Sequence, residues 1–235
     1  MCKTPSPSLF FPLFTLFVLV SFGQLQASII TTPTDLNVGD QYRLVFVTSG
    51  TMTAESGDIA DYNAFVDGFG DIAIASDWKA IASTEGGVDA HDNIGTAGGD
   101  GVSIYNLAGE RVANNYSDFW DGSIQTAIKY DESGAAVGGA DAIWTGSTTA
   151  GETAYGLGTD VIYGSTYGAA NGSSDIWIDY ETTQTDDPGR LYGMSDIFTV
   201  PSSDPIPEPA SVISWTLLGI VGCVGTWWNR RRKAS

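Results

Sequence analysis

Two stretches decide the fold of this 235-residue chain: Gln41-Tyr-Arg-Leu-Val-Phe-Val-Thr48 near its start and Leu191-Tyr-Gly-Met-Ser-Asp-Ile-Phe-Thr-Val200 near its end. Both are rich in β-branched and aromatic residues, and Gly50 closes the first, as is typical of strands that end at a turn. Helical and loop patterns lie between them. This order predicts an α+β domain whose first and last strands pair.

A helical pattern follows the first strand. Asp58 is a suitable N-cap, and apolar residues recur behind it at helical spacing, at Ile59, Tyr62, Phe65 and Val66. We therefore expect an amphipathic helix over about residues 58–67.

The remaining middle of the chain alternates short apolar segments with Gly-rich loops. In chain order, we expect a strand or turn at 78–83, a loop at 86–101, a strand, turn and strand over 102–113, a turn leading into a short helical or irregular stretch at 117–128, a strand at 142–145, a long surface region or a pair of weak strands at 151–174, and the last strands at 175–179 and 191–200. A Pro- and Ser-rich spacer follows at 201–206.

Both ends of the chain carry targeting patterns. A basic start at Lys3, an apolar segment over 9–22 and a small residue at Ala27 predict a secretory signal peptide at 1–27, which implies export through the Sec translocon. At the other end, an uncharged apolar run covers residues 211–228. At about 1.5 Å per residue this run reaches roughly 27 Å, enough for one transmembrane helix.

The apolar run is flanked by two further features in a fixed order. Pro207-Glu208-Pro209-Ala210-Ser211 precedes it and Arg230-Arg231-Arg232-Lys233 follows it, and such a basic cluster stays cytoplasmic. The whole of residues 207–235 resembles the PEP-CTERM sorting signal of Gram-negative bacteria. The resemblance implies recognition by an exosortase, an inner-membrane intermediate, and delivery to the cell surface or extracellular matrix after removal of the tail. The alternative is an ordinary C-terminal anchor that is never cleaved.

The part between the targeting segments is strongly acidic. Residues 28–206 hold 27 of the 28 acidic residues and 5 of the 10 Lys and Arg, a formal charge of −22. Such a surface repels nucleic acid and anionic lipid. It attracts divalent cations or a basic partner, or simply keeps an exported protein soluble.

Cysteine chemistry is excluded from the same part. Cys2 falls in the expected signal peptide and Cys223 in the apolar run, so residues 28–200 have no thiol, disulfide or cysteine-held metal.

Several segments of the middle share short motifs with one group of proteins. They are Asp77-Trp-Lys-Ala-Ile-Ala-Ser83, Asp89-Ala-His-Asp92, Ser103-Ile-Tyr-Asn-Leu-Ala-Gly-Glu110, Asp118-Phe-Trp-Asp-Gly-Ser-Ile124, Ile143-Trp-Thr-Gly-Ser147, and the stretch from Arg190 to Phe198. In this order they resemble bacterial surface families with a C-type-lectin-like, endostatin-like fold. The resemblance implies a lectin-like exported domain over residues 28–200 with a loop-rich middle. The calcium-dependent sugar loop of lectins is missing, and Trp177-Ile-Asp179 has Ile where an amide ligand would stand, so the fold does not carry the sugar site with it.

Hard oxygen ligands gather in two segments and suggest a structural calcium ion. The candidate ligands are Asp89, Asp92, Asn93 and Asp100 in one loop, and Asp175 and Asp179 in the other. The alternative is solvated turn residues, since turns favour Asp and Asn. The lone histidine, His91, is a general base or metal ligand, or a surface residue.

Aromatic residues fall into two groups. Trp78, Trp120 and Trp144 sit among apolar neighbours and are expected in the core. The tyrosines of the Gly-rich region, Tyr155, Tyr163 and Tyr167, form a glycan-stacking platform or cover the edge of the core.

These observations predict a non-enzymatic protein of the cell surface or exopolysaccharide matrix that binds or scaffolds an exopolysaccharide or a matrix protein. The alternatives are a calcium-dependent glycan-binding lectin and an enzyme acting on matrix polysaccharide, although no Gly-x-Ser-x-Gly elbow or distinctive carboxylate pair supports catalysis.

Overall fold

This computed structural model describes residues 29–95, 101–139 and 141–202. The expected signal peptide, the sorting motif, the apolar run at 211–228, the basic cluster and Asp100 all lie outside these residues. No helix of the described part is long and apolar enough to span a membrane.

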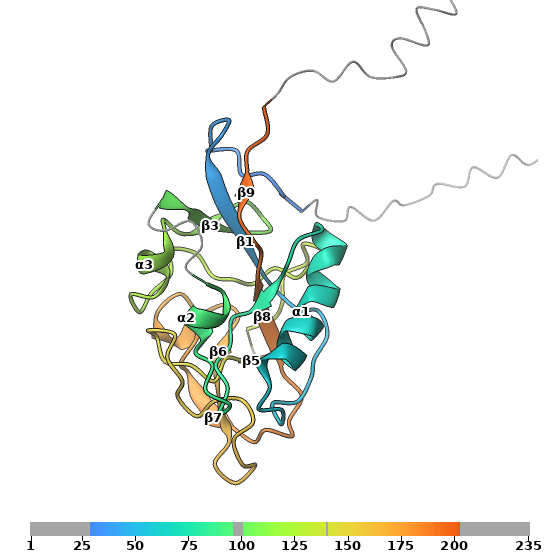
Figure 1. The fold of residues 1–235 in the computed structure, drawn as a ribbon, viewed down its shortest axis with the longest axis vertical. Helices are drawn as coiled ribbons and strands as arrows, with labels where there is room; N and C mark the ends of the chain where they lie inside the picture. The colour runs from blue at the N-terminus through green and yellow to red at the C-terminus, as the bar shows by residue number, and fades with distance from the viewer. Residues whose placement is uncertain (1–28, 96–100, 140, 203–235) are drawn as a thin grey trace, which may run out of the picture.

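One large mixed sheet organises the domain (Figure 1). Its strands are β1 (Gln41–Val47), β2 (Lys79–Ala80), β3 (Ser103–Asn106), β4 (Arg111–Ala113), β5 (Ala142–Trp144), β6 (Ser165–Ala169), β7 (Glu181–Thr183), β8 (Arg190–Met194) and β9 (Phe198–Thr199). Within the described residues the order is β4-β3-β1-β8-β5-β6-β7, while β2 pairs with β8 and β9 with β1. β1 is parallel to β3 and β5 is parallel to β8; the other pairs are antiparallel. The helices are few and mostly short, so the expectation of a domain that mixes helices and strands is confirmed.

The first and last strands pair, as predicted. β1 runs antiparallel to β8, with Val45 opposite Met194, and antiparallel to β9, with Gln41 opposite Thr199. All but the first residue of β1 are buried, because this strand is covered on both faces of the sheet.

The predicted helix is α1 (Ile59–Ala73), which begins where expected and runs about a turn and a half further than residue 67. The Asp58 carboxylate caps it by accepting a 2.9 Å hydrogen bond from the Ala60 N–H. The helix continues through Gly70 because its buried stripe of Tyr62, Val66 and Gly70 still faces the sheet there.

The sheet separates two apolar cores, and alternate residues of β1 enter each. Leu44 and Phe46 pack with α1, Trp78 and Trp144 on one face, while Val45 and Val47 pack on the other face with Phe119 and Trp177. Trp78 and Trp144 are fully buried as predicted, whereas Trp120 is only partly buried at the rim of the second core.

Most predicted short elements are present. The strand–turn–strand at 102–113 is β3 and β4, the strand at 142–145 is β5, and the described part of the loop at 86–101 includes a helical turn, α2 (Ala90–Asn93). The stretch at 117–128 opens with α3 (Tyr116–Phe119), and the uncertain region 151–174 supplies one strand, β6.

One predicted strand is wrong. Residues 175–179 begin with a 3₁₀ helix, η2 (Asp175–Trp177), in place of a strand. The Asp175 side chain accepts a hydrogen bond from the Ile176 N–H, and the Ile178 and Asp179 N–H groups both turn back to the Asp175 carbonyl. These local bonds compete with strand pairing, and they bury Trp177 and Ile178 together instead of on opposite faces.

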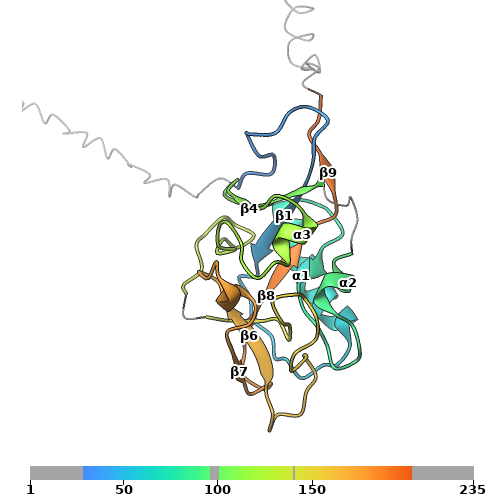
Figure 2. The same ribbon diagram turned by 90° about the vertical axis from the view of Figure 1, so that its left-hand side faces the viewer.

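The described chain enters and leaves the domain at one end. The first residues after 29 and the last before 202 lie at the upper end in both views, and the β6–β7 hairpin lies at the lower end (Figures 1 and 2). One end of the sheet therefore lies beside the first and last described segments, and the opposite end is made of β6, β7 and the loops beside them.

Candidate functional site

A pocket of about 420 Å³ opens beside the starts of β5 and β8. The parallel pairing of these strands places Ile143 opposite Arg190, so the residues that begin both strands meet at one edge. The lining comes from the loop after β1, the start of β5, the β6–β7 hairpin and the turn into β8: Thr51, Asp141, Ala142, Tyr167, Thr183, Asp187, Pro188, Gly189 and Arg190.

The Arg190 guanidinium is the fixed centre of this pocket. Its Nε donates to Asp141 Oδ2 at 2.8 Å, and its Nη1 donates to the Thr48 carbonyl at 2.8 Å and the Ser49 carbonyl at 2.5 Å. Ser49 is held in turn by the buried carboxylate of Glu132, which accepts from the Ser49 N–H at 2.9 Å. Arg190 is therefore oriented in advance, and its Nη2 has no hydrogen-bond partner among the described residues, so its N–H groups can serve another acceptor.

Tyr167 forms an aromatic wall of the pocket. Its hydroxyl lies 3.2 Å from Glu181 Oε2, and its ring meets Tyr180 edge to face at 5.7 Å between centroids. Burial, followed by the hydrogen bond to Glu181, raises the pKa of Tyr167, so the phenol remains a protonated donor. The floor is Gly189, where a Cβ would approach the Trp144 indole nitrogen to 2.5 Å.

The three tyrosines predicted to contact glycan differ in their relation to the pocket. Only Tyr167 lines the pocket. Tyr155 and Tyr163 project from the loop before β6 with exposed fractions of 58% and 69%. Neither of them lines this pocket.

Asp89 and Asp92, two of the predicted calcium ligands, come together with His91 around α2. One ligand atom from each lies within 4.8 Å of the others. His91 Nδ1 is 3.1 Å from the Gly151 carbonyl, which can only accept, so Nδ1 carries a proton and Nε2 faces Asp92 Oδ1 at 3.2 Å. An imidazole nitrogen beside carboxylates suits a transition metal better than calcium, which prefers oxygen. The same contact is an ordinary surface ion pair when the ring is protonated, so the geometry alone assigns no metal.

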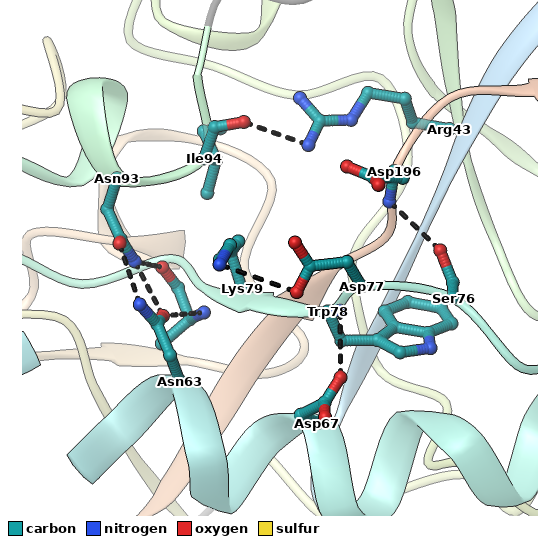
Figure 3. Close-up of polar contacts among 11 residues, drawn as sticks. Arg43, Asn63, Asp67, Ser76, Asp77, Trp78, Lys79, Asn93, Ile94 and Asp196 are labelled. Carbon is teal, nitrogen blue, oxygen red and sulfur yellow. Dashed lines mark hydrogen bonds and ion pairs between the residues drawn. The ribbon is translucent and has the colours of Figure 1, made fainter. Parts of the chain in front are cut away.

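The other predicted calcium ligands are placed elsewhere. Asn93 turns away from the Asp89–His91–Asp92 group and exchanges hydrogen bonds of 2.8 and 2.9 Å with Asn63 (Figure 3). Asp175 and Asp179 belong to η2 and the residues just after it. Burial, and then the charge of Asp175, raises the pKa of Asp179.

Sequence reasoning missed Arg43 as a structural centre. This side chain is only 4% exposed and donates to three carbonyls: Ser195 at 2.7 Å, Ile94 at 2.9 Å and Gly95 at 3.3 Å. It thereby ties β1 to the end of β8 and to the chain just after α2, with Asp196 beside it (Figure 3). Burial lowers the pKa of Arg43 to about 10, which leaves the guanidinium charged at neutral pH. The sequence signal that could have revealed this role is a single cation, Arg43, within an otherwise apolar strand.

No protein-family model matches the chain, and no curated protein matches it either. Fold and site together show a mixed α/β domain with a polar, aromatic-walled pocket at the end of the sheet away from the first and last described segments.

Proposed function

We propose that this chain is an exported protein of the bacterial cell surface or exopolysaccharide matrix, which binds or scaffolds a matrix component through a lectin-like domain. In this proposal the Sec translocon exports it, and an exosortase acting at Pro207-Glu208-Pro209 releases it from an inner-membrane intermediate. We propose no enzymatic activity.

The observation that carries this proposal is the position of the pocket. Strand β9, after which the spacer and the sorting signal follow in sequence, lies at one end of the domain, and the β6–β7 hairpin lies at the other (Figures 1 and 2). While its C-terminal segment holds the protein in the inner-membrane intermediate, the pocket beside that hairpin would face away from the membrane. The formal charge of −22 on residues 28–206 supports a soluble domain outside the cell.

Calcium-dependent glycan binding is a second candidate function. The approach of Asp89 and Asp92 favours it, although the nitrogen of His91 in the same group weakens the case for calcium. An enzyme acting on matrix polysaccharide is the third candidate, and no observation in the described residues favours it.

The sorting part is tested with Glu208→Ala, compared with Asp204→Ala as a control that removes a nearby acid outside the motif. We expect Glu208→Ala to remain in the inner membrane at unprocessed mass, because the exosortase would no longer recognise its motif. The Asp204→Ala protein should be processed like the parent. If Glu208→Ala reaches the surface at its normal mass, the sorting proposal is wrong.

A further inference from the structure

We propose that the pocket beside β5 and β8 binds an uncharged sugar residue directly, without a metal ion. This inference rests on the proposed function in one respect: it takes the domain to be exported and names the ligand that the domain would bind there. It differs from a calcium-dependent lectin in both the site and the means of recognition.

The chemistry of the lining matches a sugar. A pyranose presents vicinal hydroxyls, which both donate and accept, and a C–H face that packs on aromatic rings. Asp141 and Asp187 supply carboxylate acceptors, Arg190 supplies N–H donors, and Tyr167 supplies the aromatic wall. The volume of about 420 Å³ falls within the roughly 300–1,000 Å³ typical of small-molecule sites.

The polar groups are held in place before a ligand arrives. The contacts of Arg190 with Asp141 and two carbonyls fix the donor, and the hydrogen bond from Thr183 Oγ1 to Asp187 Oδ2, 3.1 Å long, fixes an acceptor. Asp141 and Asp187 each use Oδ2 in these bonds, and among the described residues Oδ1 of each has no hydrogen-bond partner, so it can accept from a sugar hydroxyl. Such preorganisation reduces the entropy lost on binding.

The charge balance selects against acidic sugars. Arg190 is the one cation among the lining residues, and Asp141 already pairs with it, whereas Asp187 adds a further negative charge and Glu181 lies behind Tyr167. A uronate or a sulfated sugar would therefore meet net negative charge in a strongly acidic domain. A neutral hexose or N-acetylhexosamine would not.

A metal ion is not needed at this position. Within residues 29–95, 101–139 and 141–202, the group of three potential metal ligands is Asp89, His91 and Asp92, none of which lines the pocket. The cationic partner of Asp141 is Arg190 itself. We therefore expect binding that is insensitive to chelators.

The test measures binding of the full chain to immobilised neutral oligosaccharides of glucose, galactose, mannose and N-acetylglucosamine, and to matched uronate-containing oligosaccharides, with and without EDTA. We expect binding to at least one neutral set, no binding to the uronates, and no effect of EDTA. Tyr167→Ala and Asp187→Asn should each weaken binding tenfold or more. Tyr167→Phe, which keeps the ring, should retain it.

Matched controls lie close by in the chain. Tyr163→Ala removes an exposed tyrosine outside the pocket, and Asp186→Asn removes the acid next to Asp187, so both should bind like the parent. Thermal unfolding confirms that each variant is folded. Loss of binding in EDTA, a preference for uronates, equal loss in the controls, or no binding to any neutral set would overturn the inference. None of these results would affect the sorting proposal, which Glu208→Ala tests separately.

Discussion

Arg43 shows how a single residue can connect segments that are distant in the sequence. Its guanidinium has no buried carboxylate partner among the described residues; three backbone carbonyls accept its hydrogen bonds, and Asp196, an exposed residue just after β8, supplies an opposite charge. A buried cation held in this way is costly to desolvate but even costlier to remove, because its acceptors would be left without donors.

We predict that Arg43→Met lowers the free energy of unfolding by about 3 kcal/mol, since three buried or half-buried carbonyls lose a charged donor. Lys79→Met is the control: Lys79 makes a surface ion pair with Asp77 at 3.4 Å, and its removal should cost less than about 1 kcal/mol. Urea unfolding of both variants measures the difference. Equal stability of the two variants would show that Arg43 does not have this role.

Asp89 is a second single residue with a traceable role, because the stability that its carboxylate contributes depends on pH. Its Oδ1 accepts from the Thr153 Oγ1 at 2.6 Å and the Thr153 N–H at 2.7 Å, and these bonds hold the pKa of Asp89 below its usual range. A carboxyl with a lowered folded-state pKa stabilises the fold above its unfolded pKa, and this contribution disappears as the pH falls through the folded pKa.

We therefore predict that Asp89→Ala costs about 1 kcal/mol at pH 6 and progressively less below about pH 4, where the carboxyl becomes protonated. Unfolding curves of the parent and the variant across this range measure the effect. A difference that stays constant down to pH 2 would mean that the charge of Asp89 is not what stabilises the loop.

At the scale of elements, α1 shows how close packing determines which residues a helix tolerates. The helix contains two glycines separated by one residue, Gly68 and Gly70. A Cβ at Gly68 would meet nothing within 4 Å, whereas a Cβ at Gly70 would lie 2.4 Å from the Trp78 indole. Only the second glycine is therefore required by the approach of the helix to its neighbour.

We predict opposite effects from the same substitution at these positions. Gly68→Ala should raise stability by roughly 0.5–1 kcal/mol, because alanine restricts the unfolded chain and favours the helix. Gly70→Ala should lower it by about 1–3 kcal/mol through overpacking against Trp78. Thermal unfolding of both variants decides this, and a stabilising Gly70→Ala would contradict the packing of α1 described above.

Local patterns in the sequence were sufficient for some elements only. The β-branched run of β1 and the Asp58 cap of α1 act over a few residues, so both could be predicted. Residues 175–179 could not, because the hydrogen bonds of Asp175 outweigh the strand preference of their apolar residues. Likewise, Tyr167 was a predicted glycan contact, but nothing local separates it from Tyr155 and Tyr163.

At the scale of the whole molecule, the pocket depends on contacts that no local pattern encodes. Asp141 and Arg190 meet because β5 and β8 are parallel neighbours, and Tyr167 joins them through the antiparallel pairing of β6 with β5. The same topology places the first and last described segments at the other end of the sheet. In our proposal, this arrangement lets one end of the domain serve sorting while the opposite end binds a ligand.

The most direct test of this account is the intact mass of the protein recovered from surface and membrane fractions of its native host. We predict a surface form that lacks residues 1–27 and the tail beyond Pro207-Glu208-Pro209. A protein found only in the membrane fraction, with a mass that still includes Arg230 to Ser235, would contradict sorting to the surface and would indicate a permanently anchored domain.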